Sequence, residues 1–238
     1  MKLIIISIFA ILFIATSTIA GEYGKENHEN NIHISVKDNQ NLISYLETIA
    51  SEKLDDMEIE ALTYMIEEEK LARDVYSMLS QHWGIIVFQN ISASEQIHMN
   101  AISYLLDRYG IENPGNSYEI ASFGNEEIQS LYLSLVEKGS AGIIEALYVG
   151  ATIEELDIYD LQQRFFMTDN EDMKAVFQNL MKGSRNHLRS FASLLKKSGF
   201  EYEAQYLIQE EVDDIIFSDR ERGIVDADGI PVSLNNRF

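Results

Sequence analysis

The sequence has no cysteine, few prolines and few basic residues. It contains no Cys and only two Pro in 238 residues. Disulfides, zinc fingers and thiol chemistry are therefore excluded, and the scarcity of proline favours long uninterrupted helices. The 18 Lys and Arg stand against 39 Asp and Glu, which gives a formal net charge of -21. A surface this acidic repels nucleic acid and anionic lipid, so we expect neither as a partner.

Residues 1–20 have the pattern of a secretory signal peptide. Lys2 precedes an apolar run from Leu3 to about Ala15, and the small-residue stretch that ends at Ala20 follows. This is the order of charged, apolar and cleavage regions in such signals. The alternative is an uncleaved membrane anchor, for which the apolar run is somewhat short. We predict an exported protein, periplasmic, extracellular or at the cell surface, with no membrane segment after cleavage.

Beyond residue 20 the sequence predicts a flexible lead-in (21–40), one helical domain (41–223) and a C-terminal tail (224–238). Residues 21–40 are polar and poor in apolar side chains, which is typical of flexible segments. In the domain, apolar residues spaced by three and four predict amphipathic helices over 56–82, 92–109, 141–166 and 171–197. Shorter helices are expected over 126–138 and 203–217.

The connections between these helices indicate how they are arranged. Short connections follow the first and third long helices, whereas a long one between residues 110 and 139 joins the second to the third. Two helical hairpins joined by one long crossover are typical of ferritin-like four-helix bundles. We therefore predict an all-α fold, a ferritin-like four-helix bundle whose crossover carries a short helix, followed by a C-terminal helix.

Polar side chains interrupt the apolar stripe of each long helix near its middle. These interruptions are Glu69, Glu95, His98, Glu154, Ser184 and His187. Burying an ionised carboxylate without a partner costs several kcal/mol, and several together would be prohibitive without compensation. Two divalent cations would supply about four positive charges. The pattern therefore predicts a metal site inside the bundle.

Each of these residues also has an ordinary structural explanation. A Glu on an apolar stripe often reaches solvent from its edge, and a lone buried His is often a hydrogen-bonded core residue. Their coincidence on four helices favours the metal site. Carboxylate and imidazole donors suit iron, manganese or zinc, and we expect one or two iron ions. Glu68 and Glu155 would replace Glu69 and Glu154 if the helix registers shifted by one residue.

Four sequence strings resemble one known family. They are EEEKLARDVY (67–76), SEQIHM (94–99), GATIEELDIYDL (150–161) and GSRNHLRSF (183–191). These strings resemble the domain of unknown function 2202 family, over roughly residues 54–223. That family is grouped with the ferritin-like superfamily, so the resemblance implies the bundle fold, but the activity of the family is not established.

A more distant similarity is to rubrerythrin-type di-iron proteins. These place a Glu in the first and third helices and Glu-x-x-His in the second and fourth. The similarity implies that Glu95 bridges two irons, with terminal ligands at Glu69, His98, Glu154 and His187. The fourth helix departs from the pattern because Ser184 stands where the Glu is expected. Three Glu leave about one positive charge unbalanced, unless Asp157, hydroxide or an outside anion balances it. Asp157 is therefore a further candidate metal ligand.

Three functions follow from these features. The leading hypothesis is iron-dependent redox chemistry with oxygen or peroxide. The others are metal binding without catalysis, and a purely structural or partner-binding bundle in which Arg and water satisfy the acids. Expected partners are metal ions and, as a homodimer, a second copy of the chain. There is no Gly-rich phosphate loop and no nucleophile elbow.

Overall fold

The computed structural model describes residues 28–116 and 119–233, so the predicted signal peptide lies outside the described residues. In these ranges the chain forms seven α-helices, one 3-10 helix and no strand, which confirms the all-α prediction. None of the described helices has the length and hydrophobicity of a membrane span. The elements are α1 (His28–Leu46), α2 (Asp56–Trp83), α3 (Ile86–Tyr109), η1 (Pro114–Asn116), α4 (Glu126–Ser140), α5 (Ile143–Met167), α6 (Glu171–Lys197) and α7 (Gln209–Phe217).

Local capping chemistry sets several helix ends where the sequence predicts them. Asp55 caps α2 by accepting hydrogen bonds from the Met57 and Glu58 amides, and Glu58 accepts one from the Asp55 amide in return. This reciprocal pair satisfies amides that the first helical turn leaves free. At the end of α3, Gly110 has φ +67, a left-handed conformation that favours glycine.

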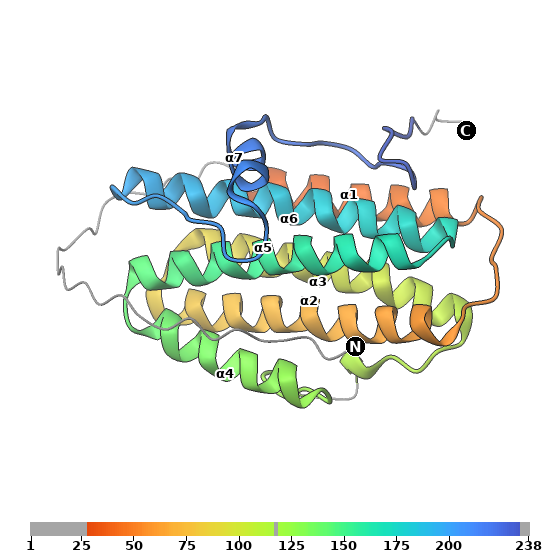
Figure 1. The fold of residues 1–238 in the computed structure, drawn as a ribbon, viewed down its shortest axis with the longest axis horizontal. Helices are drawn as coiled ribbons and strands as arrows, with labels where there is room; N and C mark the ends of the chain where they lie inside the picture. Colours follow the sequence, from red (N-terminus) through yellow and green to blue (C-terminus); the bar gives the residue numbers. More distant parts are fainter. Residues whose placement is uncertain (1–27, 117–118, 234–238) are drawn as a thin grey trace.

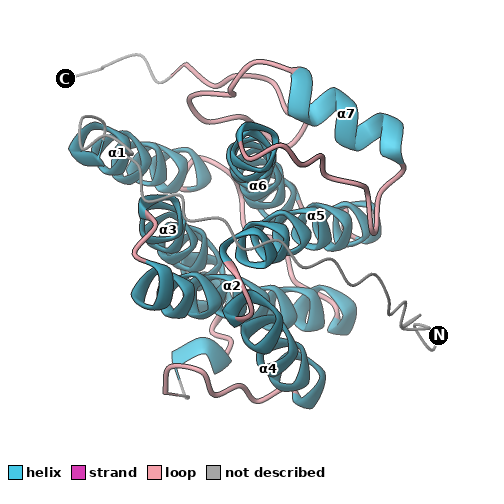
Figure 2. Ribbon diagram, turned by 90° about the vertical axis from the view of Figure 1, so that its left-hand side faces the viewer, coloured by secondary structure: helices cyan, strands magenta, loops and turns pink. Residues whose placement is uncertain are grey.

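The four long helices α2, α3, α5 and α6 lie side by side (Figure 1). The pairs α2–α3 and α5–α6 pack most extensively, and α2 also contacts α5 as α3 contacts α6. Viewed end-on, α1 lies against α3 and α6, whereas α4 covers α2 and α5 on the opposite side (Figure 2). The crossover between α3 and α5 thus carries α4 around the outside of the long helices.

Two apolar cores fill the space between these helices. One contains Tyr76, Phe88 and Phe191, whose rings lie 5.5 to 6.1 Å apart. The other contains Ile66 from α2 and Ile102 from α3. Every long helix passes from one core to the other, and the buried polar residues of the predicted site lie at these crossings. The polar layer is therefore shielded by apolar packing on both sides.

The structure differs from the sequence prediction at the N-terminal lead-in. We expected a flexible segment through residue 40, but α1 already begins at His28. Leu42 and Leu46 are buried in the second core. Arg108 of α3 donates hydrogen bonds to the Leu46 and Ile49 carbonyls, at 2.6 and 2.5 Å. Contacts with α3 and α6 thus stabilise a helix that its polar composition alone does not indicate.

Three other helix boundaries also differ. The third long helix, α5, begins at Ile143 after its N-cap Gly142 and not at residue 141, because α4 extends to Ser140. The second, α3, begins six residues earlier than predicted, at Ile86. The C-terminal helix α7 begins at Gln209 rather than near residue 203. The backbone amides of residues 205–207, which precede it, donate hydrogen bonds to the buried Glu155 carboxylate of α5.

Candidate metal centre

The polar layer brings together all five residues that the sequence predicts as the Glu and His ligands. Four helices supply them, and each of these residues is between 1 and 8 % exposed. They come from α2 (Glu69), α3 (Glu95 and His98), α5 (Glu154) and α6 (His187). Glu95 and His98 share one face of α3, because residues three apart are neighbours on a helix surface.

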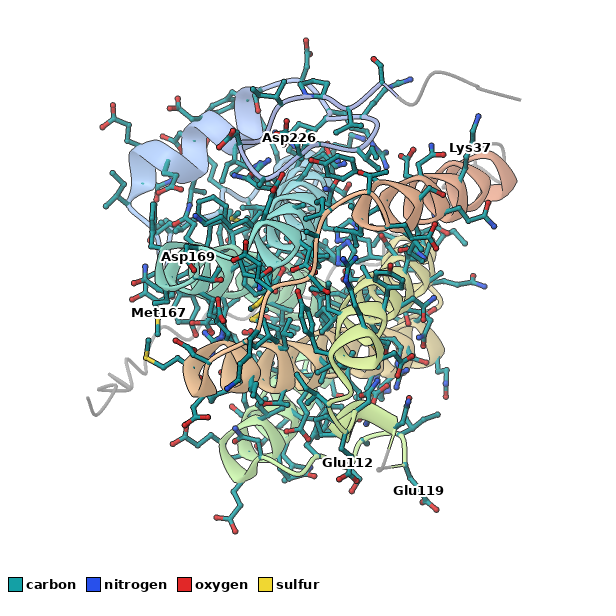
Figure 3. The ribbon with its side chains drawn as sticks, turned by 90° about the vertical axis from the view of Figure 1, so that its right-hand side faces the viewer. Lys37, Glu112, Glu119, Met167, Asp169 and Asp226 are labelled. Carbon is teal, nitrogen blue, oxygen red and sulfur yellow. The ribbon has the colours of Figure 1, made fainter. Side chains whose placement is uncertain are left out.

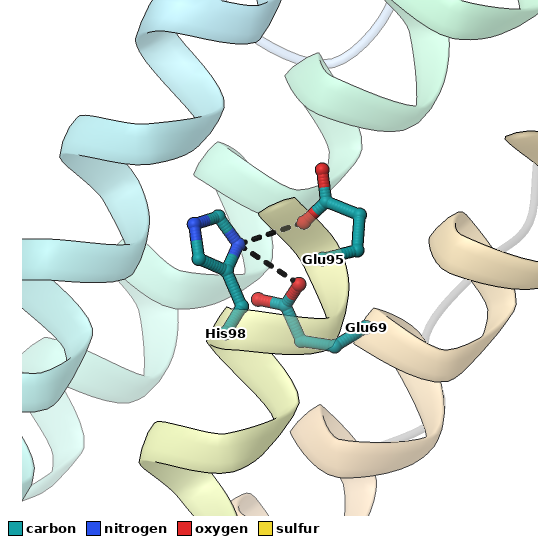
Figure 4. Close-up of side chains that lie close together, drawn as sticks. All are labelled: Glu69, Glu95 and His98. Atoms are coloured by element: carbon teal, nitrogen blue, oxygen red, sulfur yellow. Dashed lines mark hydrogen bonds and ion pairs between the residues drawn. The ribbon is translucent and has the colours of Figure 1, made fainter. Parts of the chain in front are cut away.

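Glu95 lies at the centre of the cluster and contacts both histidines. One of its carboxylate oxygens is 2.7 Å from Nδ1 of His98, and the other is 2.8 Å from Nδ1 of His187. Glu69 lies 3.1 Å from Nδ1 of His98 (Figure 4), and Glu154 lies 3.2 Å from Nδ1 of His187. The result is two adjoining groups of three donors that share Glu95, each with its ligand atoms within 4.8 Å of one another.

Asp157 lies beside these two groups and is not a member of either. Its carboxylate accepts a hydrogen bond from the Ser184 hydroxyl, which also donates to the Leu180 carbonyl at 3.0 Å. Both residues are buried. Ser184 therefore binds an additional acid that lies near the cluster. The sequence identified Asp157 as a candidate ligand and Ser184 as a residue that departs from the Glu-x-x-His pattern. It did not indicate that the two residues contact each other.

The two alternative carboxylates, Glu68 and Glu155, do not join the cluster. Glu155 is satisfied by backbone amides and by the Tyr202 hydroxyl, at 2.5 Å. Glu68 is buried, and neither of its oxygens accepts a hydrogen bond within the described residues. The helix registers are thus those that place Glu69 and Glu154 at the site.

Three further residues orient the ligands. The Tyr76 hydroxyl donates to Glu154 at 2.5 Å, and the Ser94 hydroxyl lies 3.0 Å from Nε2 of His187. Gly183 of α6 faces His98, because a Cβ atom at Gly183 would lie 2.3 Å from Nε2 of that ring. Tyr76 follows Glu69 by seven residues on the same stripe, so periodicity could have identified it. No sequence pattern of this kind indicates that Ser94 and Gly183 contact the ligands.

The sequence matches the uncharacterized protein domain DUF2202 over residues 58–219. The chain belongs to the DUF2202 family. An uncharacterized protein of Methanocaldococcus jannaschii is 47% identical over 183 residues, which is 77% of this chain and 99% of the relative. The crystal structure of a hypothetical protein from Methanococcus jannaschii matches with a TM-score of 0.72 and 48% identity, covering 73% of this chain and 99% of that one.

Burial and mutual contact shift the pKa values of this DUF2202 cluster. Burial raises the pKa of Glu69 and Glu154, and neighbouring acids raise them further. Burial alone would raise the pKa of Glu95, but the imidazolium rings of His187 and His98 hold that pKa below its usual range. Burial lowers histidine pKa values, yet the adjacent carboxylates more than offset this for His98 and raise that of His187 to about 9. In the metal-free protein, protons therefore lie between the Nδ1 atoms and the carboxylates.

The donor set fits divalent cations. It offers carboxylate oxygens and imidazole nitrogens, which iron, manganese and zinc accept. One oxygen of Glu69 and one of Asp157 are buried without a hydrogen-bond donor in the part of the chain that the structure describes, and each such group costs about 1–3 kcal/mol. The ion pairs of Lys and Arg within that part go to other acids: Asp74, Asp160, Asp172 and Glu221. Among the described residues, no Lys or Arg therefore forms an ion pair with the carboxylates of the cluster. A bound metal ion would supply the missing positive charge.

The pKa of His187 predicts how metal binding depends on pH. Because its folded value of about 9 exceeds the reference value of 6.5, the imidazolium stabilises the metal-free protein below pH 6.5, and this contribution, up to about 3 kcal/mol, is lost as pH rises through 9. Metal binding needs the neutral ring. The stabilisation by Mn²⁺, measured as the difference in Tm between loaded and metal-free protein, should therefore grow from pH 6.5 to 9.

The matched control for this pH dependence is the exposed His82. The His82→Gln variant should keep the pH-dependent difference in Tm, whereas His187→Gln should lose most of it. A difference in Tm that stays constant between pH 6.5 and 9 in the unsubstituted protein would show that metal does not displace protons from this cluster.

Proposed function

We propose that this protein binds two divalent metal ions, iron in the first place, and uses them for redox chemistry with oxygen or peroxide. The observation that carries the proposal is the position of Glu95, whose two oxygens face the Nδ1 atoms of His98 and His187 at 2.7 and 2.8 Å. One shared carboxylate thereby joins two donor groups. A carboxylate that serves both groups is well suited to bridge a pair of ions.

We also propose that the fold is a ferritin-like four-helix bundle. Four long helices, one long crossover between α3 and α5, and a Glu-x-x-His pair at the middle of the bundle support this assignment. In such bundles, inward-facing carboxylates and histidines from facing helices hold metal ions. We further propose that residues 1–20 direct export and are then removed, and that the mature protein forms a homodimer.

The surrounding residues hold the ligands in place. The Tyr76 hydroxyl fixes the orientation of the Glu154 carboxylate, and Ser94 binds Nε2 of His187 so that Nδ1 faces the cluster. Contacts of this kind set the tautomer and direction of a ligating histidine. Bound iron would supply the electrons for the reaction with oxygen or peroxide. The apolar cores on both sides of the layer restrict the access of water.

A second candidate function is metal binding without catalysis. The observation that favours it is Ser184, which occupies the position of the fourth Glu and binds Asp157. With three Glu in the two groups, the carboxylates do not balance the charge of two divalent ions. This alternative predicts the same metal content as the redox proposal but no turnover.

The redox proposal is tested by loading the purified protein with Fe²⁺ without oxygen and adding hydrogen peroxide in a stopped-flow spectrometer. We expect the bound iron to be oxidised at least about tenfold faster than free Fe²⁺ in the same buffer, because the ligands hold it in a preorganised site. The control variant is Glu137→Gln, an exposed residue of α4, which should behave as the unsubstituted protein. Full iron occupancy with no oxidation above that of free Fe²⁺ would favour the non-catalytic alternative.

A further inference from the structure

A cavity of about 230 Å³ lies beside the histidine side of the metal centre. Figure 2 shows α1, α3 and α6 side by side, with the C-terminal segment crossing above α6. The cavity lies between these three helices and that segment, which we define as the C-terminal strap, residues 218–232. Its inner end is formed by Ser94, His98 and His187, so a molecule bound there would contact the rings that face the metal ions.

The C-terminal strap is a fixed wall of this cavity. The Asn186 side chain forms two hydrogen bonds with the Glu221 backbone, at 3.0 and 3.1 Å. About two helical turns earlier on the same face of α6, the Asn179 side chain forms two with the Val225 backbone, at 2.7 and 3.1 Å. Asp226 follows on this strap above α6, beside the α1 helix that carries Lys37 (Figure 3). The two Asn side chains thus hold the strap along α6 and keep the cavity open beneath it.

The charges around the cavity are positive, although the chain as a whole is strongly acidic. Arg220 and Arg222 line it and are exposed, and neither forms an ion pair among the residues that the structure describes. The carboxylate of Glu221 is already bound by two other arginines, Arg185 and Arg189. Lys182 and Asp38 also line the cavity and offset each other. Within the described ranges, Arg220 and Arg222 therefore have no ion-pair partner, although the protein has a net charge of -21.

The middle of the cavity is apolar. Its wall there is formed by Leu42 of α1, Ile97 and Ala101 of α3, Leu180 of α6 and Ile224 of the strap. An apolar cavity of about 150 Å³ is large enough for benzene. A cavity of about 230 Å³ therefore has room for a ring or short chain together with one charged group.

We propose that this cavity binds a small organic acid, with its carboxylate at Arg220 and Arg222 and its apolar part against Leu42, Ile97 and Ala101. Guanidinium groups bind carboxylates through paired, charge-assisted hydrogen bonds, and the apolar wall holds the rest of the molecule. Binding of the acid follows from the cavity alone. The acid would in addition be the substrate of the metal centre, and this part of the proposal rests on the proposed function.

The experiment measures the binding of benzoate and of benzamide, its neutral counterpart, to the purified protein by calorimetry at fixed ionic strength. Metal-free and Mn²⁺-loaded protein are compared. We expect benzoate to bind both forms, and benzamide to bind at least about tenfold more weakly, because it lacks the charge that the arginines recognise. Equal affinities for the two ligands, or no binding of benzoate, would overturn the proposal.

Variants identify the residues that bind the carboxylate. Arg220→Gln with Arg222→Gln should weaken benzoate binding by about tenfold or more. The control pair, Lys138→Gln with Lys197→Gln, removes the same charge at exposed positions away from the cavity and should change the affinity less than about twofold. Asp38→Asn should strengthen binding, because it removes a carboxylate that repels the ligand. Circular dichroism checks that each variant is folded.

The outcomes separate this proposal from the proposed function. Benzoate binding that depends on the arginines in a protein that binds no metal would support the cavity and contradict the metal centre. Benzoate binding only to Mn²⁺-loaded protein, unchanged by the arginine substitutions, would mean that the carboxylate is a metal ligand, and would overturn the cavity proposal.

Discussion

The Glu95→Gln variant is expected to lose both metal ions. Glu95 is the residue that the two donor groups share, and each of its oxygens faces a different histidine. Glutamine keeps the volume of the side chain but removes its charge and one carboxylate oxygen. The affinity of both positions should fall by at least about 100-fold, since the loss of a group that only orients a ligand already costs 10- to 100-fold. Metal analysis after dialysis measures this effect.

Two further substitutions give this prediction its matched comparison. Glu69 belongs to one donor group and Glu154 to the other. The Glu69→Gln and Glu154→Gln variants should therefore each lose about one ion per chain, whereas Glu137→Gln should lose none. If Glu95→Gln retains both ions, or if the three site variants lose metal to the same extent, then Glu95 does not bridge two positions.

Gly183→Ala is expected to displace His98 and to weaken the metal position at Glu69. Alanine is the better helix former by about 1 kcal/mol, so helix propensity alone predicts stabilisation. The added Cβ would, however, lie 2.3 Å from Nε2 and 2.6 Å from Cε1 of the His98 ring. The ring must move, and because His98 is held between Glu69 and Glu95 it cannot move without breaking those contacts. We therefore expect a lower Tm and the loss of about one ion.

Gly139→Ala is the control for this steric effect. A Cβ at Gly139 would lie 2.8 Å from the Leu79 side chain, in the apolar core and away from the ligands. This variant should have a lower Tm than the unsubstituted protein but the same metal content. If Gly183→Ala binds metal as the unsubstituted protein does, the ring of His98 is not required at its present position.

Local signals account for the parts of the fold that the sequence predicts well. The helix α6 spans Glu171–Lys197 as predicted, and α4 begins after Asn125, whose side chain caps it. These helix boundaries depend on residues that lie within one turn of the boundary in the sequence. By contrast, α1 packs against α3 and α6, and the segment before α7 is bound by Glu155, about fifty residues away. Periodicity and capping contain no information on such distant contacts.

In the candidate site too, local sequence patterns predict some features, whereas contacts between distant residues determine others. Glu69, Glu95, His98, Glu154 and His187 were predicted from the helical period alone, because each interrupts an apolar stripe, and the structure brings them together. The contacts that orient them were not predicted, because they join residues of different helices, such as Ser94 with His187 and Gly183 with His98. Asp157 was predicted as a ligand, but the structure places it against Ser184.

Arginine side chains, instead of metal ions, could in principle neutralise the buried acids of the cluster. Arg185 and Arg189 of α6 both bind Glu221 of the C-terminal strap. Arg73 binds Asp74 and Gln96. The carboxylates of the cluster contact the two histidines and Tyr76 instead. This arrangement favours a metal over an arginine as the compensating charge.

Anomalous diffraction from crystals soaked in Mn²⁺ tests the central claim most directly. Two anomalous peaks are expected, on either side of the Glu95 carboxylate and about 3.5–4 Å apart, one next to Nδ1 of His98 and the other next to Nδ1 of His187. Crystals that show no peak in this layer at saturating Mn²⁺, with Glu95 still in contact with Nδ1 of both histidines, would contradict the account.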